Sequence, residues 1–351
     1  RKLKDPIAVL WLLTVGGRGK RPIHLNYTMK RLYEKGHKMN IQVEFKETHL
    51  FDLVASQDGF EQLVYQGKSV SRMPDAVLSR LGAKIDYYGL AVVRHLEKMG
   101  VLVLNNHNAL EVSRDKLHTV QDLAAHGMPI PKTMIAKFPP NEEIIKREFK
   151  FPLILKHSSG TQGKGVMLIE TADHLKGISD MIDVSKPMIF QEFIANSAGK
   201  DIRAIVVGGR VVGAMMRVAK SGFKANFHQG GYVKKIKLSP AVEWLAIEAT
   251  RLIGLDVAGV DILIDKNSYK ICEINSSPGF NGFEMATEVD VPFHILDFVK
   301  LRTGVWQKRN REKKRVVIPV EEEVQEPAPA PTPATIEINV DASQTQQPTS
   351  N

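Results

Sequence analysis

The sequence predicts an α/β domain followed by two α+β units, and three observations carry this fold class. Strand and helix patterns alternate over residues 5–107, which is typical of a parallel sheet whose strands are connected by helices. Two apolar β runs then flank a glycine-rich loop within 152–169, and two more over 257–280 indicate an antiparallel hairpin. We place the three units at 1–107, 108–187 and 188–305.

The composition of the 351 residues is that of a soluble globular protein, with 43% apolar and 25% charged residues and a net charge of +9. The single cysteine, Cys272, excludes an internal disulfide scaffold and a four-cysteine metal site, and most simply fills a buried strand position. The longest apolar run, Ile7–Val15, is shorter than the ~20 residues that span a bilayer. We therefore expect a cytoplasmic protein without a membrane partner.

The N-terminal elements follow from apolar periodicity and from the residues at their ends. Gly36 is expected to end the first helix and Gly100 the second. Asn108 and Glu111 have the spacing of a capping box, so we expect the next helix to begin at Asn108 and to end at Gly127. The expected strands lie at 7–15, 39–45, 73–82 and 101–105, and the two earlier helices at 26–35 and 88–99.

A glycine-rich loop joins two apolar β runs in "PLILKHSSGTQGKGVMLI", residues 152–169. Backbone N–H groups of such a loop can surround phosphate oxygens. The order is strand–loop–strand, so the segment is not a P-loop, in which the loop leads into a helix. Lys156, at the end of the first run, can hold a phosphate as a point charge. The segment is compatible with a lid that folds over nucleotide phosphates.

Two further stretches place polar residues in apolar surroundings. Glu192 lies in the apolar strand "MIFQEFI". Burying its carboxylate there is costly unless a ribose hydroxyl or an adenine amino group pairs with it. The alternative is an edge-strand carboxylate that faces solvent. A hairpin is expected to turn at Gly208–Gly209, with Asp201 and Arg203 on one strand face. A polar set follows that could neutralise a transferring phosphoryl group, although each member alone indicates a surface charge: Arg217, Lys220, Lys224, Asn226 and His228.

Two carboxylates are expected to face each other in the hairpin over 257–280. Asp261 and Glu273 are embedded in apolar strand residues, and Asn275 lies two residues after Glu273, on the same face. If Lys266–Ser268 forms a three-residue loop, Asp261 lies directly opposite Glu273, and the two carboxylates repel. A divalent cation removes this penalty, and such oxygen ligands suit Mg²⁺. The alternatives are a carboxylate pair for unaided acid–base catalysis and two unrelated solvent-facing acids.

The charge is unevenly distributed towards the C-terminus. Residues 308–315 hold six basic residues and one acidic residue, whereas 321–351 hold six acidic residues and no basic one. The latter stretch has five prolines and no aromatic residue, so it cannot bury enough apolar surface to fold. We expect 306–351 to be a basic linker and a disordered tail. The basic body indicates anionic partners, such as a nucleotide, an acidic peptide or RNA.

The motifs, taken in order, resemble those of a known enzyme family. They are "SRDK", "LILK", "GTQGKGV", "QEF", "DIR", "N-x-H-x-GG", "DVAGVDIL" and "EINSSPGF". The set is similar to the ATP-grasp ligases, and most of all to the RimK-type group, which adds glutamate to ribosomal protein S6. The resemblance runs from about Asp5 to Gly304. It implies an ATP-grasp fold, with a pre-ATP-grasp domain at 1–107, a central lid subdomain at 108–187 and a C-terminal metal-binding subdomain at 188–305.

The resemblance also implies roles for individual residues. Glu192 and Phe193 would lie at the adenine hinge, and Asp201 near the ribose. Arg203 would stabilise an acyl phosphate, and Asn226, in the family's asparagine position, would be a second catalytic residue. The ATP phosphates would be contacted by Lys116, Lys156, Gly160, Gly163, Gly165, Lys224, Ala225 and Asn226, and two Mg²⁺ or Mn²⁺ ions by Asp261, Glu273 and Asn275.

By the same resemblance the protein is an ATP-dependent carboxylate–amine ligase that acts through an acyl phosphate. L-glutamate or a similar amino acid would supply the amine, and an acidic protein C-terminus or a small carboxylate would be the acceptor. Two departures from the family pattern, Lys224 in place of Arg and Gln229 within "HQGG", bear on the acceptor. The other hypothesis is a non-catalytic nucleotide- or RNA-binding regulator. A ribosomal or RNA association is compatible with the sequence. A homo-oligomer is compatible with the sequence.

Overall fold

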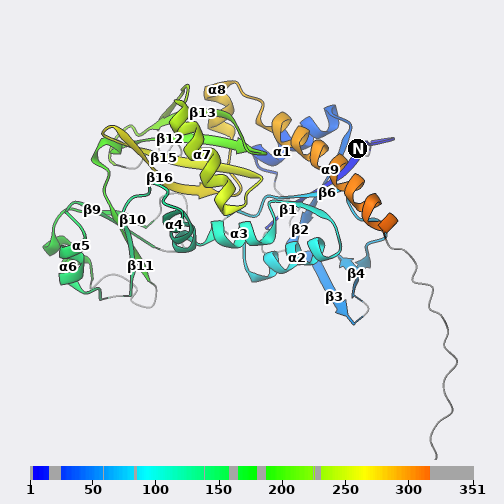
Figure 1. Ribbon diagram of the computed structural model, residues 1–351, viewed down its shortest axis with the longest axis horizontal. Coiled ribbons are helices and arrows are strands. Elements are labelled where there is room, and N and C mark those ends of the chain that lie inside the picture. Colours follow the sequence, from blue (N-terminus) through cyan, green and yellow to red (C-terminus); the bar gives the residue numbers. More distant parts are fainter. Residues whose placement is uncertain are drawn as a thin grey trace, which may run out of the picture. The chain divides into compact units, whose positions relative to one another are not determined.

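Four sheets organise the residues that the computed structural model describes (Figure 1). Residues 1–309 form one compact unit, and of the unit that follows only the end of a helix, up to Val316, is described. The described residues are 3–15, 25–57, 59–82, 85–137, 139–157, 165–179, 187–223, 225 and 231–316.

The N-terminal part is built on a parallel sheet with the strand order β2-β1-β6-β7. The chain alternates between these strands and two helices, as the sequence predicts. Both faces of the sheet are buried, which explains why its strands are almost wholly apolar. The elements are β1 (Ala8–Thr14), α1 (Tyr27–Lys38), β2 (Ile41–Glu47), β6 (Ala76–Ser79), α2 (Tyr87–Lys98) and β7 (Leu102–Leu104).

The first helix does not end at Gly36, contrary to the prediction. It continues to Lys38, and Gly36 serves a close approach instead: a Cβ atom there would lie 2.5 Å from Val43 Cγ2 on the neighbouring strand β2. The glycine therefore lets α1 pack tightly on the sheet, which periodicity alone does not reveal.

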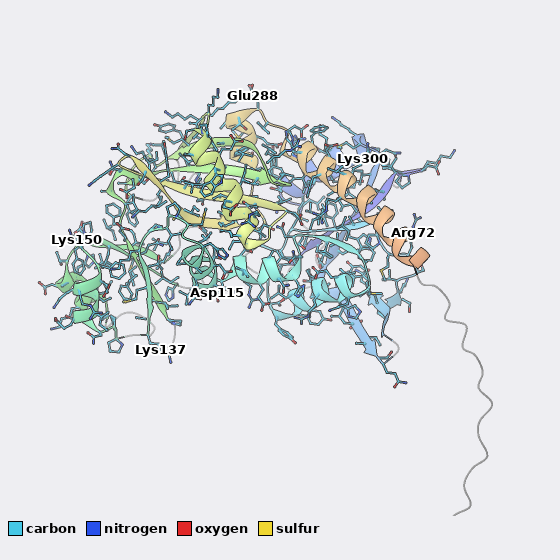
Figure 2. The ribbon with its side chains drawn as sticks, viewed as in Figure 1. Arg72, Asp115, Lys137, Lys150, Glu288 and Lys300 are labelled. Atoms are coloured by element: carbon cyan, nitrogen blue, oxygen red, sulfur yellow. The ribbon has the colours of Figure 1, made fainter. Side chains whose placement is uncertain are left out.

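The single helix predicted from Asn108 to Gly127 is in fact two helices, α3 (His107–Arg114) and α4 (Lys116–Ala125). The N-cap of α3 is Asn106, whose side chain accepts from Ala109 N at 3.0 Å, so the capping box expected at Asn108 is wrong. Asp115, labelled in Figure 2, has an extended backbone and caps α4 by accepting from Leu117 N and His118 N. A residue with strong capping chemistry thus breaks the apolar pattern into two.

A small antiparallel sheet was not anticipated from the alternating pattern. It consists of β3 (Phe51–Ser56), β4 (Gly59–Tyr65) and β5 (Lys68–Ser69), preceded by the short helix η1 (Thr48–Leu50). The ring of Phe51 lies 6.0 Å from that of Trp11 and 4.7 Å from that of Tyr65, so aromatic packing joins this sheet to β1.

The central part is a four-stranded antiparallel sheet with the order β10-β9-β11-β8. The two apolar runs around the glycine-rich loop form the predicted strand pair, with Lys156 opposite Val166. The loop itself, 158–164, lies outside the described residues. The elements are β8 (Thr133–Ala136), α5 (Glu142–Glu148), β9 (Leu153–His157), β10 (Val166–Ile169), α6 (Ala172–Ser179) and β11 (Met188–Glu192).

The third part is a five-stranded antiparallel sheet with the order β14-β13-β12-β15-β16 (Figure 1). One face packs on α7 (Pro240–Ile253) through a core that includes Ala204, Val260 and Ile274. The hairpin predicted at Gly208–Gly209 is present. The strands are β12 (Lys200–Val207), β13 (Arg210–Val218), β14 (Tyr232–Lys235), β15 (Val257–Asp265) and β16 (Ser268–Asn275), and η3 (Ala195–Ser197) precedes them.

Two helices follow the last strand, α8 (Asn281–Thr287) and α9 (Val291–Val316). Side chains of both pack in one core with the parallel sheet and with β12, so the N-terminal strands and the C-terminal helices stabilise each other. The basic run 308–315 lies within α9, in the last turns of the described helix. None of the described helices combines the length and the apolar content needed to span a bilayer.

Candidate active site

A polar surface lies on the face of the five-stranded sheet that is turned away from α7. Alternate residues of β15, such as Val260 and Ile262, pack in the core with α7, which leaves Asp261 on the opposite face. The same alternation on β12 places Arg203 beside it. We call this surface the polar face; it consists of Asp201, Arg203, Arg217, Asp261, Glu273 and Asn275.

Asp261 and Glu273 lie directly opposite each other in the β15–β16 ladder, which confirms the predicted pairing. The predicted reason for it is wrong. The turn has two residues, Lys266 and Asn267, and the extra residue is Cys272, which forms a β-bulge where the register shifts.

The bulge decides which side chains of β16 join the polar face. Ile271 and Ile274 both pack in the core with α7, although residues three apart in a regular strand point to opposite faces. Because Cys272 and Glu273 together oppose Asp261, the alternation is restored after them, and Asn275 follows Glu273 on the polar face. The sequence spacing I-C-E-I therefore requires the bulge.

The charges at the centre of the polar face neutralise one another. Arg203 donates from Nε and Nη2 to the two carboxylate oxygens of Asp261, at 2.6 Å each. Arg217 donates in the same way to Asp201, at 2.6 and 2.5 Å, and its Nη2 also lies 2.9 Å from Asp261 Oδ2. Arg217 is only partly exposed and is paired, so its interpretation as a surface charge is wrong: across the ladder it pairs with Asp201.

The pKa values on this face reflect burial and these ion pairs. Burial alone would raise the pKa of Asp261, but the charges of Arg203 and Arg217 outweigh it and hold the pKa below its usual range. Burial raises the pKa of Asp201 to about 6, against the opposing effect of Arg217. Asp261 is therefore the firmly ionised carboxylate of the network, and its predicted role as a metal ligand requires that charge.

Two lysines from other elements lie near this face. Burial lowers the pKa of Lys116, the first residue of α4, while Glu273 raises it and Lys156 lowers it, so the three charges are close enough to interact. On β9, Lys156 Nζ donates to Gln191 Oε1 at 2.9 Å, and Gln191 in turn donates to Thr133 Oγ1 at 2.9 Å. The structure thus brings both predicted phosphate-binding lysines towards the predicted metal ligands.

Cys272 lies among these charged groups. Burial raises the pKa of its thiol to about 11; Lys156 opposes the rise, and Glu273 and Asp261 add to it. Cys272 is half-buried at the bulge, whereas the sequence predicted a buried strand position; its thiol remains protonated at neutral pH.

The carboxylate of Glu192 has a cationic partner that the sequence did not reveal. Its Oε2 accepts from Lys270 Nζ at 2.7 Å and from Lys132 N at 3.1 Å. Burial would raise the pKa of Glu192, but the hydrogen bond from Lys270 lowers it. The next residue, Phe193, presents its ring edge-on to Phe223 at 6.5 Å between centroids. The predicted roles of Glu192 and Phe193 at an adenine hinge stay predictions.

Several predicted site residues fall outside the described part of the chain. They are Gly160, Gly163, Lys224 and Asn226, together with His228 and Gln229. Of their neighbours, Gly165 is described and has a φ of +69°, which suits glycine, and Ala225 is half-buried.

The donor set of the polar face fits a divalent cation. The carboxylate of Asp261 accepts three hydrogen bonds or ion pairs from arginine, and a carboxylate has about four acceptor positions, so one remains for a metal. Glu273 is exposed and faces it across the ladder. Asn275 Nδ2 is buried and has no hydrogen-bond partner among the described residues. This nitrogen is a donor and cannot bind a cation, so a metal would be held by the amide oxygen Oδ1. The described residues contain no cluster of three His, Cys, Asp or Glu, so an amide ligand has to complete the site.

Asn105 is a structural residue of this site that the sequence reasoning did not single out. Its buried side chain accepts from Asp256 N at 2.7 Å and from Val257 N at 2.8 Å, and donates to Val257 O at 2.8 Å and Ser276 O at 2.9 Å. It thereby ties the end of β7 to the start of β15 and to the residue after Asn275. The available signal was an amide at the end of the apolar run "VLVLN".

Comparison with known proteins agrees with this geometry. A RimK-like ATP-grasp domain matches residues 113–299, and a RimK PreATP-grasp domain matches residues 23–110. A protein described as a "Probable alpha-L-glutamate ligase" from Vibrio parahaemolyticus is 38% identical over 291 residues, which is 82% of this chain and 96% of the relative. One of the same description from Legionella pneumophila is 43% identical over 242 residues, which is 67% of this chain and 79% of the relative.

A solved structure supports the fold. The ATP-grasp ligase PsnB, complexed with a phosphomimetic variant of its minimal precursor, Mg and ADP, has a TM-score of 0.64 to this chain at 20% identity, covering 85% of this chain and 100% of PsnB. The predicted fold class is confirmed, with the parallel sheet in the pre-ATP-grasp region and the two antiparallel sheets in the grasp region. The chain belongs to the RimK-like ATP-grasp family and is an ATP-grasp ligase.

Proposed function

We propose that this ligase uses ATP to join the amino group of L-glutamate to a carboxylate at the C-terminus of a protein or peptide. The observation that carries the proposal is the polar face, where Asp261 opposes Glu273 and two lysines, Lys116 and Lys156, lie nearby. Such a face neutralises a triphosphate, which is what activation of a carboxylate by ATP requires. The choice of glutamate is supported by the description shared by both relatives.

The reaction has two steps. The acceptor carboxylate attacks the γ-phosphorus of ATP in line, giving an acyl phosphate and ADP. The free amino group of glutamate then attacks the acyl carbon, and the tetrahedral intermediate releases inorganic phosphate and leaves an amide. No side chain of the enzyme has to form a covalent bond, so the residues act by positioning and by neutralising charge.

The described residues have distinct tasks in this scheme. Lys116 and Lys156 bind phosphate oxygens, and the hydrogen bond to Gln191 holds Lys156 in place. Arg203 uses Nε and Nη2 on Asp261, so its Nη1, for which the described residues offer no hydrogen-bond partner, is available to the acyl phosphate. Glu192, positioned by Lys270, accepts from the nucleoside.

Two Mg²⁺ or Mn²⁺ ions would be held by Asp261, Glu273 and Asn275, and when bound they neutralise the phosphate charge and hold the triphosphate in line. Glu273 is exposed and would offer its carboxylate oxygens to these ions, whereas most acceptor positions of Asp261 are taken by arginine.

The test is to incubate the purified protein with ATP, Mg²⁺, L-glutamate and a cell extract or an acidic peptide. We expect phosphate release that depends on both glutamate and the acceptor, and mass increments of whole glutamate residues on the acceptor's C-terminus. L-glutamine replaces glutamate as the matched control for the side-chain carboxylate. Phosphate release that is indifferent to glutamate, or that Glu273→Ala leaves at the wild-type rate, contradicts the proposal.

A further inference from the structure

Arg80 stands out because its guanidinium is partly desolvated and no described residue gives it an acidic partner. It follows β6, its Nη2 donates to Pro278 O at 2.7 Å, and its guanidinium lies 5.9 Å from the ring centroid of Phe280. No carboxylate among the described residues pairs with it. Burial lowers the pKa of Arg80 to about 10, and no neighbouring acid offsets this. A desolvated cation is costly unless an anion accompanies it.

A second unpartnered group lies beside it. Thr14 is only 6% exposed, and its Oγ1 has no hydrogen-bond partner among the residues that the structure describes. The β1–β6 ladder pairs Leu13 with Ser79, and Arg80 N continues it by donating to Leu13 O at 2.9 Å, so Thr14 and Arg80 are neighbours at the carboxyl ends of two adjacent strands.

Both side chains point to the side of the sheet where Phe280 packs. Leu12 and Leu78 belong to the same core as Phe280, and Thr14 and Arg80 each lie two residues further along the same strands. We call Thr14 and Arg80 the carboxyl edge. The strand order places β2 on one side of β1 and β6 on the other, and ligands of open parallel sheets bind where the order reverses in this way.

The carboxyl edge is joined to the polar face by the segment that follows β16. Pro278, which accepts from Arg80, packs on Gly259, where a Cβ atom would lie 2.7 Å from Pro278 Cβ. Gly259 pairs with Asn275 in the β15–β16 ladder. A group held by Arg80 is therefore held next to the end of the strand that carries the predicted metal ligands.

We infer that Arg80 and Thr14 form a subsite for a carboxylate that stays ionised during the reaction, and that this is a carboxylate of L-glutamate. The inference rests on the proposed function. The acceptor carboxylate is consumed when it takes the phosphoryl group, so it has to lie at the γ-phosphate. Glutamate attacks through its amine and keeps both of its carboxylates. Arg80 would donate to one of them, with the Thr14 hydroxyl as an additional donor.

Steady-state kinetics with Arg80→Gln, Arg80→Lys and Thr14→Val test this subsite. Arg80→Gln should raise KM for L-glutamate about 10- to 100-fold, the range expected for a lost charge-assisted hydrogen bond, while KM for ATP stays within about twofold. Arg80→Lys should recover part of the loss, and Thr14→Val should raise KM for glutamate about 3- to 10-fold. The control is Arg72→Gln, which removes an exposed arginine (Figure 2) and should change none of these constants.

The acceptor can also bring a carboxylate, and the same variants distinguish the two sources. If KM for the acceptor rises instead of KM for glutamate, the subsite takes a second carboxylate of an acidic acceptor and the assignment to glutamate is overturned. If Arg80→Gln and Thr14→Val leave both constants at the Arg72→Gln values, the subsite itself is overturned. It is equally overturned if KM for ATP and the thermal midpoint of Thr14→Val deteriorate together with KM for glutamate, because a structural defect then explains the loss.

Direct binding separates this inference from the proposed function. Isothermal titration of L-glutamate, and of glutarate, which lacks the amine, into the wild-type protein with ADP and Mg²⁺ should give binding that Arg80→Gln weakens about 10-fold or more. A protein that binds both compounds through Arg80 but transfers no glutamate contradicts the proposed function alone. A protein that transfers glutamate with unchanged affinity in Arg80→Gln contradicts the subsite alone.

Discussion

On the polar face, Arg203 and Arg217 both reach the carboxylate of Asp261, whereas at the carboxyl edge Arg80 meets only the carbonyl oxygen of Pro278 and the ring of Phe280. Both regions remove cations from water. In the first, the folded chain supplies the counter-charge from strands that pair directly across the sheet. In the second, the described residues supply none.

The difference shows that a buried cation can have either of two roles, depending on whether the folded chain supplies its counter-charge. A cation whose partner is a neighbouring strand residue mainly fixes geometry: Arg203 and Arg217 hold the oxygens of Asp261 in one orientation. A cation without such a partner adds an energetic cost that a ligand can relieve. Substitutions on the polar face should therefore change mainly the stability of the protein, and substitutions at the carboxyl edge mainly its affinity for substrate.

The largest expected effect is that of Asp261→Asn. Removing this charge leaves Arg203 and Arg217 without their shared carboxylate, so the free energy of unfolding should fall by about 3–5 kcal/mol, and ligation should be lost. Urea unfolding followed by circular dichroism measures the change. If this variant is as stable as Arg80→Gln, Arg203 and Arg217 need no counter-charge from the chain, and the contrast between the polar face and the carboxyl edge is wrong.

Asn105→Ala removes the tie between the end of β7 and the segments at both ends of the β15–β16 hairpin. Its four hydrogen bonds, one to Asp256, two to Val257 and one to Ser276, are lost at a buried position, and the free energy of unfolding should fall by about 2–4 kcal/mol. The adjacent Asn106→Ala is the matched control: it loses the N-cap of α3, for which about 1 kcal/mol is expected. Equal losses in the same urea experiment would mean that Asn105 has no special coupling role.

Thr14→Val should raise the free energy of unfolding by about 1 kcal/mol, because it replaces an unsatisfied buried hydroxyl with a methyl group of the same shape. The control is Thr250→Val. The Thr250 hydroxyl is buried too but donates to Ala246 O at 2.8 Å, so its loss should lower stability by about 1 kcal/mol. Changes of opposite sign in the free energy of unfolding would support the view that the Thr14 hydroxyl is unsatisfied and the Thr250 hydroxyl is not. A destabilised Thr14→Val protein would contradict it.

The smallest expected change in stability is that of Glu273→Gln. This substitution removes a carboxylate that opposes Asp261, so the free energy of unfolding should rise by about 0.2–1 kcal/mol. Ligation should nevertheless fall about 100-fold or more, because a ligand of the metal is lost. Glu111→Gln, at an exposed helix position, should change neither quantity. A stable, active Glu273→Gln enzyme would exclude Glu273 as a metal ligand.

Much of the fold could be predicted from the sequence because it depends on short-range patterns. Apolar alternation located the β12–β13 and β15–β16 hairpins and the strands of the parallel sheet, although the predicted turn of the β15–β16 hairpin was one residue too long. The errors arose where a residue has two possible uses. Gly36 indicated a helix end but serves a close approach to Val43, and Asp115 divides one apolar pattern into two helices.

The site shows the same division between local and long-range information. The placement of Asp261, Glu273 and Asn275 on one face follows from spacing within strands once the register is known. The partners of Arg217 and Glu192 do not follow from spacing: Asp201 lies on the neighbouring strand, and Lys270 lies on a different sheet, 78 residues along the chain. Likewise, nothing near Arg80 in the sequence indicates that no described acid will lie beside it.

The bulge at Cys272 has a consequence for how this hairpin tolerates changes in length. Because Cys272 is the residue that β15 leaves unpaired, its deletion would convert the hairpin into a regular ladder and keep Glu273 opposite Asp261. Deleting Glu273 instead would remove the predicted ligand. Deleting Ile274 would place the polar side chain of Asn275 where an apolar one packs. Chains one residue shorter at this single point can therefore retain the same chemistry, so an alignment gap there is no sign of a lost activity.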